Sequence, residues 1–354
     1  MAAIDTNTAA VMGSPVGEPD ELTSEWLSAA LRRDIADVSG VARIGTGQMS
    51  RTYRVGYDGS DGAQTVIAKL PANDADSLAT ARHTDIYLRE VSFYRELAPQ
   101  CHDAVAQCHF SAHDPETNLF TLLLEDVPGA TVIDQLEGCD LPTARRVVTT
   151  IAAVQGAVLD SEAVHQAPWL NRATPFSQQL FGSVLPGFKD RYADSIDPQT
   201  ELVLDRFGAS LDWWNAHLEG PRGVQHGDCR LDNILLSPNR CALVDWQTAV
   251  AGSPLADLAY FMGGSMTVEV RRRHERELVD QFHAELTQAS GLEVSVEWCH
   301  EEYRRRAFLG VMMAVIGAMT AGRTPRGDQL FRTMLDRHTA HVLECDALDL
   351  LPRG

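Results

Sequence analysis

Lysine is nearly absent from this chain of 354 residues: only two of its 30 basic residues are lysines, Lys69 and Lys189. Positive charge of any kind is also in short supply, because 49 acidic residues leave a formal net charge of −19 at pH 7. A surface of this sign does not attract the phosphates of nucleic acids or of an anionic membrane. We therefore expect neither among its partners, whereas a cationic or neutral small molecule remains compatible.

Paired cysteines and long apolar runs are also missing. The seven cysteines form no Cys-x-x-Cys pair, which excludes the common zinc spacing and favours reduced thiols. Residues 1–10 have neither the basic region nor the apolar core of a secretory signal. The most apolar stretch, residues 307–322, is short for a membrane span. We expect a cytoplasmic protein in which this stretch forms a buried helix.

The length predicts two lobes, since about 150 residues make one ordinary domain. We expect a flexible tail at 1–19, a small α+β lobe at 20–126 that binds a nucleotide, and a mainly helical lobe at 127–354 with the catalytic loop and the acceptor pocket. A Pro-Gly turn at 126–130 marks the boundary. The expected elements are a helix at 22–33, strands at 41–47, 51–57 and 64–70, a helix at 83–98, a strand at 119–125, a helix at 141–159 and a strand pair at 234–245.

Lys69 lies inside the apolar strand "TVIAKLP", where its compact charge differs from an arginine fork in the way it meets a phosphate. Glu90 shares an apolar helical stripe with Ile86, Phe93 and Leu97. A buried carboxylate needs a cation, and Lys69 is the economical candidate. The alternatives are a solvated strand face for Lys69 and a solvated edge of the stripe for Glu90.

A glycine turn precedes these residues. Gly45 and Gly47 lie between two strands, where missing side chains let backbone N–H groups approach a phosphate. Gly-x-Gly between strands is more often a plain hairpin, so this motif gains weight only from the order in which Lys69 and Glu90 follow it.

The segment "VQHGDCRLDNILL" (224–236) places three polar groups directly ahead of an apolar run. Residues 233–246 read as a hairpin whose turn lies between Pro238 and Asn239, which sets Asn233 opposite Val244 and beside Asp245. An amide oxygen and a carboxylate are ligands that suit Mg²⁺. Asp228, on the loop that enters the hairpin, could reach a hydroxyl instead, and this division of roles matches phosphoryl transfer.

Two neighbours of this segment have less specific interpretations. His226 favours a structural role that braces the loop over proton transfer, and Asp232 reads as a solvated loop residue.

The motif "HGDCRLDN" (226–233) followed by "LVDW" (243–246) resembles the signature of the aminoglycoside phosphotransferase and choline kinase-like superfamily, whose members are distant relatives of protein kinases. "EVSFYREL" (90–97) and "LLLEDV" (122–127) are similar to its ecdysteroid-kinase-like branch, which includes bacterial phosphotransferases. The resemblance covers residues 40–345 and implies a protein-kinase-like bilobal α+β fold.

The resemblance also implies a role for each matching residue. Asp228 would be the catalytic aspartate, and Asn233 and Asp245 would hold Mg²⁺. Lys69 would contact the ATP phosphates with Glu90 as its tether. The remaining implied contacts are the backbone of Glu125 and Val127 with adenine, Gly45, Gly47 and Ser50 with the phosphates, and Asp257 with the catalytic loop.

The chain departs from the family pattern at two places. Gln48 and Met49 follow Gly47 in place of a longer glycine series, so that the phosphate clamp relies more on Ser50. Gln155 stands where many relatives carry a histidine, which affects a supporting contact and not the reaction.

Three other functions compete with a small-molecule kinase. A protein kinase is disfavoured because Gly227 replaces an arginine and only 11 residues separate Asp245 from Asp257, too few for a long activation segment. A nucleotide-binding pseudoenzyme would lack turnover, although all the catalytic residue types are present. A metal-dependent hydrolase built on His226 and Asp228 lacks a second ligand pair.

The acceptor is a small hydroxylated metabolite whose identity the sequence leaves open. Aromatic residues gather between Trp169 and Trp214 and include Phe176, Phe181, Phe188, Tyr192, Phe207 and Trp213. As a pocket wall they would favour a bulky apolar alcohol over a cationic aminoglycoside. Helix packing explains them equally well, and the acidic net charge points weakly toward a cation.

Overall fold

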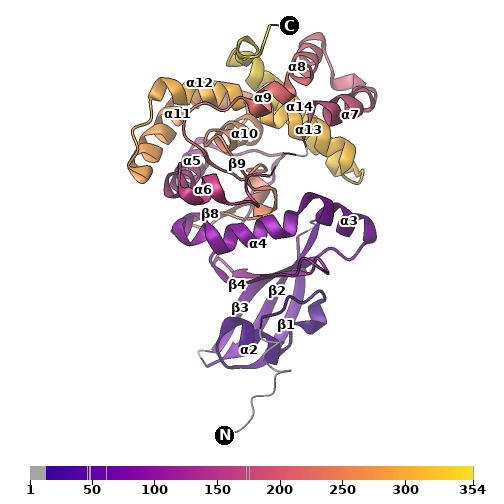
Figure 1. Ribbon diagram of the computed structural model, residues 1–354, viewed down its shortest axis with the longest axis vertical. Coiled ribbons are helices and arrows are strands. Elements are labelled where there is room, and N and C mark those ends of the chain that lie inside the picture. The colour runs from indigo at the N-terminus through magenta and orange to yellow at the C-terminus, as the bar shows by residue number, and fades with distance from the viewer. Residues whose placement is uncertain are drawn as a thin grey trace. The chain divides into compact units, whose positions relative to one another are not determined.

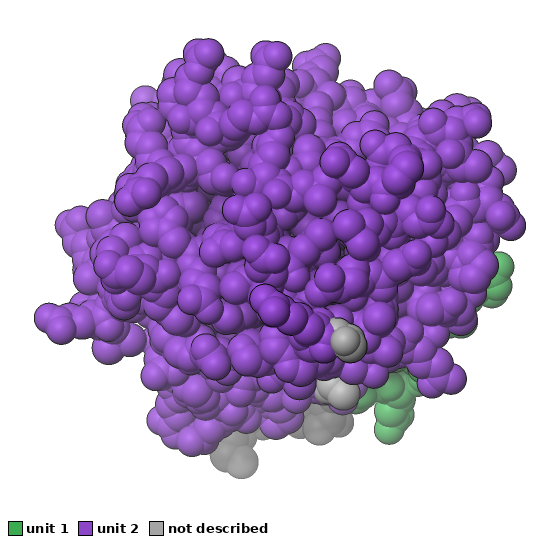
Figure 2. Space-filling view, turned by 90° about the horizontal axis from the view of Figure 1, so that it is seen from above, with its two compact units in different colours: residues 1–130, 245–248 green, residues 131–244, 249–354 purple. Residues whose placement is uncertain are grey.

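The computed structural model describes residues 13–45, 47, 49–60, 62–172, 174 and 176–353. It divides into two compact units, distinguished by colour in Figure 2. Unit 1 comprises the chain up to Ala130 together with Asp245–Thr248, and unit 2 comprises Thr131–Val244 and the chain from Ala249 onward. The short segment 245–248 thus belongs to unit 1, although the residues directly before and after it belong to unit 2.

Unit 1 is built on a five-stranded antiparallel sheet with the strand order β1-β2-β3-β5-β4 (Figure 1). The strands are β1 (Ile35–Ile44), β2 (Ser50–Gly59), β3 (Gly62–Pro71), β4 (Cys108–His113) and β5 (Phe120–Glu125). The helices are α2 (Ser24–Leu31), α3 (Ala75–Thr84) and α4 (Ile86–Glu96), with short 3₁₀ turns at Pro19–Glu21, Ala98–Gln100, His102–Ala104 and Trp246–Thr248. Strand β4 is absent from the sequence-based prediction.

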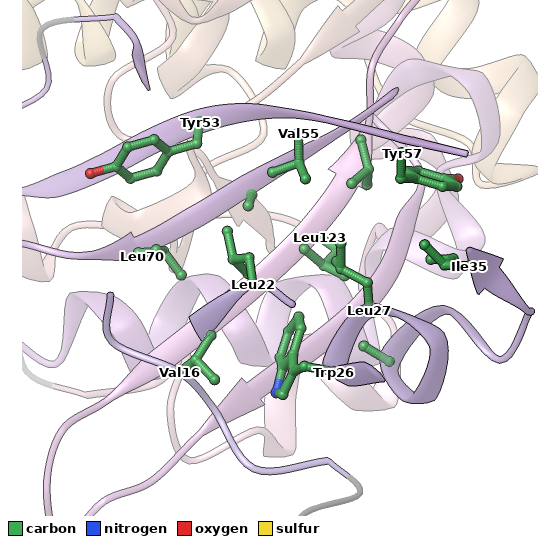
Figure 3. Close-up of a cluster of buried hydrophobic side chains, with 13 residues drawn as sticks. Val16, Leu22, Trp26, Leu27, Ile35, Tyr53, Val55, Tyr57, Leu70 and Leu123 are labelled. Carbon is green, nitrogen blue, oxygen red and sulfur yellow. The ribbon is translucent and has the colours of Figure 1, made fainter. Parts of the chain in front are cut away.

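Alternation along β2 and β3 creates the core of unit 1. Tyr53, Val55 and Tyr57 of β2 are buried on one face, as are Val66, Ala68 and Leu70 of β3, because side chains two residues apart in a strand share a face. Figure 3 shows α2 closing this face with Trp26 and Leu27. The face opposite Ala68 and Leu70 carries Lys69.

Two predictions in unit 1 are wrong in detail. The helix predicted at 83–98 begins at Ile86, because Asp85 adopts a left-handed backbone (φ 55°) that ends α3. The predicted tail at 1–19 lies partly outside the described residues, but Ser14–Glu18 packs against the unit. Val16 is buried and exchanges hydrogen bonds with the Thr121 hydroxyl, and the Glu18 carboxylate pairs with buried Arg51 at 2.8 Å.

Unit 2 is mainly helical. Its helices are α5 (Leu141–Val158), α6 (Glu162–Gln166), α7 (Gln178–Arg191), α8 (Pro198–Gly208), α9 (Leu211–Ala216), α10 (Ala256–Ser265), α11 (Val268–Ser290), α12 (Val296–Arg306), α13 (Phe308–Thr320) and α14 (Pro325–Glu344), with 3₁₀ turns at Ala193–Ser195, Leu231–Asn233 and Ala347–Leu350. The predicted hairpin is β7 (Ile234–Leu236) with β8 (Cys241–Leu243). A second pair, β6 (Gly223–Gln225) with β9 (Val250–Gly252), was not predicted.

Helix α13 corresponds to the apolar stretch and is buried, as predicted. Within the described part of the chain, no helix combines the length and the apolar character that a membrane crossing requires. All seven cysteines are free thiols, as expected from their spacing.

A buried polar cluster joins α11, α12 and α14. The Glu275 carboxylate accepts hydrogen bonds from Arg271 and Tyr303, both at 2.9 Å, and His341 lies 3.3 Å away. Burial alone would raise the pKa of Glu275, but the contacts with His341, Arg271 and Tyr303 outweigh it and lower the pKa to about 2.

This cluster predicts acid sensitivity. Between pH 4.5, the ordinary pKa of the group, and about pH 2, the unfolded chain binds a proton at Glu275 that the folded protein does not bind. The contribution of Glu275 to the free energy of unfolding is therefore present above pH 4.5 and is lost as the pH falls toward 2. Glu275→Gln should flatten the pH dependence of the free energy of unfolding in this window, measured by urea unfolding. Half-exposed Glu277 is the control, and equal flattening by Glu277→Gln would contradict the assignment.

Candidate functional site

Lys69 meets two carboxylates in unit 1. Lys69 is 6% exposed, and its ammonium lies 2.7 Å from the Glu90 carboxylate and 2.8 Å from Asp245 Oδ1. Burial opposes the charged form of Lys69, but Asp245 and Glu90 outweigh it and raise the pKa of the amine. Burial also raises the pKa of Glu90, while the Lys69 ammonium acts against it. The contact between Lys69 and Glu90 that helical spacing predicted is therefore present in the structure.

Asp245 is held beside Lys69 by the residue that follows it. Trp246 is fully buried and stacks on Phe93 of α4, with ring centroids 3.7 Å apart and planes inclined by 9°. Asp245 itself has a left-handed backbone (φ 69°), a conformation that costs on the order of 1 kcal/mol for a residue with a side chain and persists where the surroundings impose it. Helix α4 thus positions both acidic partners of Lys69.

The glycine turn leads into β2. Gly45 has φ 71°, a conformation that favours glycine, and no atom would lie within 4 Å of an added Cβ. A Cβ on Gly47 would lie 3.3 Å from the Ser50 carbonyl oxygen. Ser50 is the first residue of β2 and is 7% exposed. Gln48, named in the sequence analysis, lies outside the described residues.

The expected adenine contacts lie at the end of β5. The Glu125 N–H donates to the Gln107 carbonyl at 2.8 Å, so this donor already serves the sheet. The Val127 carbonyl accepts from the Ala130 N–H at 3.1 Å in a turn that contains Gly129 with φ 65°.

The loop of unit 2 that begins at His226 is tied to helix α10. Buried Asp257 accepts the backbone N–H groups of His226 at 2.6 Å and Gly227 at 3.0 Å. The His226 ring donates from Nε2 to the Val244 carbonyl at 2.8 Å, which leaves Nδ1 to accept the Asp228 N–H at 3.3 Å. His226 is fully buried, and these bonds give it the bracing role that the sequence favoured.

Three donors hold the Asp228 carboxylate. Oδ1 accepts the Tyr260 hydroxyl at 3.0 Å, and Oδ2 accepts Asn233 Nδ2 at 3.0 Å and Arg230 Nε at 3.2 Å. Arg230 also pairs with Asp232 at 3.0 Å, so Asp232 is an ion-pair partner and not the solvated loop residue that the sequence indicated. The Asp228 carboxylate raises the pKa of Arg230 above its ordinary value, which is already high.

The side-chain amide of Asn233 has a nitrogen and an oxygen that can bind different partners. The register of β7 and β8 pairs Ile234 with Leu243, and the Val244 N–H donates to the Asn233 carbonyl at 3.0 Å, so the predicted register is correct. The Asn233 side chain donates from Nδ2 to the Asp228 carboxylate and to the Asp228 main-chain carbonyl. The side-chain amide oxygen faces away from this nitrogen, which suits a metal ligand.

The structure thus brings Lys69, Glu90 and Asp245 together in unit 1, and Asp228 and Asn233 together in unit 2. Within the described residues, no group of three His, Cys, Asp or Glu side chains could hold a metal by itself. The sequence analysis missed Tyr260 and Arg230. Tyr260 follows Asp257 by three positions on one helix, and this spacing was the available signal.

The aromatic residues between Trp169 and Trp214 pack against each other. Phe207 contacts Phe181, Trp214 and Phe308 with ring centroids 5.6, 5.5 and 5.0 Å apart. Of the members named above, Trp169, Phe181, Phe188, Tyr192, Phe207 and Trp214 are buried. Helix packing explains these side chains, so they give no support to a bulky apolar acceptor.

Comparisons with known proteins identify the family and the fold of this chain. The model of the phosphotransferase enzyme family matches residues 40–309. Two solved structures share the protein-kinase-like bilobal α+β fold. The GDP complex of aminoglycoside 2′-phosphotransferase-IIIa has a TM-score of 0.55, 14% identity, and coverage of 86% of this chain and 94% of that one. Amicoumacin kinase with AMP-PNP, Ca²⁺ and Ami has a TM-score of 0.51, 11% identity, and coverage of 94% and 91%.

A short segment also resembles a curated protein. It is 51% identical over 39 residues to acyl-CoA dehydrogenase family member 11 of Pongo abelii and of Homo sapiens. This match covers 10% of the chain and 5% of that protein. The family model, by contrast, spans most of the chain, and the protein therefore belongs to the phosphotransferase enzyme family.

Proposed function

We propose that this protein is an ATP-dependent kinase that transfers the γ-phosphate to a hydroxyl group of a small molecule. The observation that carries the proposal is the Asp228 carboxylate, which Tyr260, Asn233 and Arg230 hold in one orientation. Phosphoryl transfer needs a carboxylate that orients the acceptor hydroxyl more than it needs a strong base. The family to which the chain belongs supports the same reaction class.

In the proposed reaction Asp228 accepts a hydrogen bond from the acceptor hydroxyl. The hydroxyl oxygen forms a bond to the γ-phosphorus while the bond between that phosphorus and the β,γ-bridging oxygen breaks. The proton passes to Asp228 and then to solvent, and the products are a phosphate ester and ADP. Lys69, kept charged by Glu90 and Asp245, would contact the α- and β-phosphates.

The remaining roles follow the chemistry of each group. Asn233 and Asp245 offer the oxygen ligands that Mg²⁺ prefers, and phosphate oxygens would complete its shell. The bound ion would neutralise charge on the phosphates. Gly45, Gly47 and Ser50 would bind the phosphates through backbone and hydroxyl donors. Adenine would contact the backbone of Glu125 and Val127, with the Glu125 N–H already used inside the sheet.

The direct test is an ATP-consumption screen of the purified protein against a panel of hydroxylated metabolites, amino alcohols and aminoglycosides. At least one alcohol should stimulate ADP formation, and mass spectrometry should detect its phosphate ester. Asp228→Asn should reduce turnover by at least about 100-fold, since a positioned acid–base group contributes this much, while Mg·ATP affinity changes little. Equal loss of nucleotide binding would contradict the role of Asp228, and ATP binding without turnover on any acceptor would indicate a pseudoenzyme.

The scarcity of lysine provides a second test. An acyl-phosphate derivative of ATP acylates an amine beside the bound phosphates. Peptide mass spectrometry should find Lys69 labelled and protected by excess ATP. Lys189, which forms surface ion pairs with Glu201 and Asp205, is the internal control and should gain no protection. Protection of Lys189 alone would refute the placement of the phosphates at Lys69.

The metal role of Asp245 has its own prediction. Asp245→Ala should abolish the strengthening of ATP binding by Mg²⁺, because a ligand of the ion is removed. Isothermal calorimetry with and without Mg²⁺ measures this difference. Asp134→Ala, which removes a carboxylate from an exposed pair with Arg326, should leave it unchanged. An unaltered Mg²⁺ effect in Asp245→Ala would show that the ion is held elsewhere.

A further inference from the structure

Helix α10 carries two side chains that hold the same loop. Asp257 accepts the backbone N–H groups of His226 and Gly227, and Tyr260, three residues further along, donates its hydroxyl to Asp228 Oδ1 at 3.0 Å. Residues three apart share a helix face. All ten residues of α10 are buried, so this helix can hold the loop backbone and its functional side chain from one rigid base.

The Tyr260 hydroxyl can act only as a donor toward Asp228. Its side chain is 3% exposed, and burial together with the Asp228 charge raises the pKa of Tyr260 well above its usual value. The phenol therefore keeps its proton through the working pH range. An ionised carboxylate has no proton to offer, so the hydroxyl proton points at Oδ1.

The Tyr260 ring is held from behind by His338 of α14. The two rings lie 5.4 Å apart with planes inclined by 14°, and His338 is fully buried. Glycines make this approach possible. A Cβ on Gly310 would lie 2.1 Å from the His338 ring, and one on Gly263 or Gly264 would lie 2.5 or 2.8 Å from it. A tyrosine fixed in this way holds its hydroxyl at one point.

The two oxygens of Asp228 differ in their donors. Oδ2 accepts from Asn233 and Arg230, whereas Tyr260 is the donor that the described residues supply to Oδ1. A carboxylate oxygen has about two acceptor directions. Two donors occupy those of Oδ2, and one donor leaves a direction of Oδ1 for a further hydroxyl.

We infer that Tyr260 is a positioning residue that directs Asp228 Oδ1 toward the acceptor hydroxyl. This inference rests on the proposed kinase function. Oδ1 is the oxygen that takes the hydroxyl proton, and Oδ2 is held by Asn233 and Arg230. The Tyr260 hydroxyl restricts rotation of the Asp228 carboxylate, and His338 keeps the phenol in place.

The test compares two buried tyrosines that each donate to a carboxylate. Tyr260→Phe removes the donor to Asp228, and Tyr303→Phe removes the donor to Glu275 at 2.9 Å. The two tyrosines are 3% and 2% exposed, so both substitutions remove one hydroxyl from a comparable environment. Rates are measured with Mg·ATP and water as acceptor, by phosphate release, and with any alcohol that the screen identifies.

Tyr260→Phe should lower kcat by about 10- to 100-fold, the equivalent of one hydrogen bond to a charged group, with the KM for ATP within about twofold of wild type. Tyr303→Phe should keep the wild-type kcat, and melting temperatures establish that both variants fold.

Other outcomes would overturn the inference. A Tyr260→Phe protein with wild-type kcat would do so, and so would equal losses of kcat in both variants. If Tyr260→Phe does not fold, His338→Ala removes the ring behind Tyr260 and should lower kcat with the KM for ATP within about twofold of wild type. A wild-type kcat in His338→Ala would count against the proposal. A wild-type protein that turns over ATP with neither water nor any alcohol would instead refute the proposed function itself.

Discussion

Unit 1 must compensate the buried positive charge of Lys69, and it does so in an ion triad with Glu90 and Asp245. Lys69 is only 6% exposed, and its ammonium remains charged because two carboxylates contact it within 2.8 Å. To supply them, α4 must turn Glu90 toward β3, and Trp246 must stack on Phe93 to hold the strained backbone of Asp245. The packing of unit 1 around α4 therefore follows from keeping this charge compensated.

In unit 2 the charged group that needs partners is an anion, the Asp228 carboxylate. Asp228 receives its donors from a loop, a 3₁₀ turn and helix α10, and the loop backbone is held by buried Asp257. An unsatisfied polar group inside a protein costs about 1–3 kcal/mol, so each of these bonds also stabilises the loop that it orients. The apolar helices around α10 supply rigidity, and small residues such as Gly310 admit the His338 ring that holds Tyr260.

Much of this arrangement could be predicted from local patterns. Short strand patterns located β2 and β3, helical spacing placed Glu90 on a buried face, and the position of the turn set the register of β7 and β8. Strand β4 and the pair β6–β9 escaped prediction, because their strands are short or contain polar residues and gain stability from partners distant in sequence. The break at Asp85 depends on a single left-handed residue that periodicity does not reveal.

The amino-acid sequence by itself indicated the reaction class that we propose, since Lys69, Glu90, Asp228, Asn233 and Asp245 belong to local motifs whose order and spacing suit phosphoryl transfer. The tertiary structure alone decided which groups orient them. Tyr260 lies 32 residues from Asp228 along the chain, and His338 lies on a different helix again. Such contacts arise when buried polar groups must find partners across a folded core, and no periodicity in the sequence encodes them.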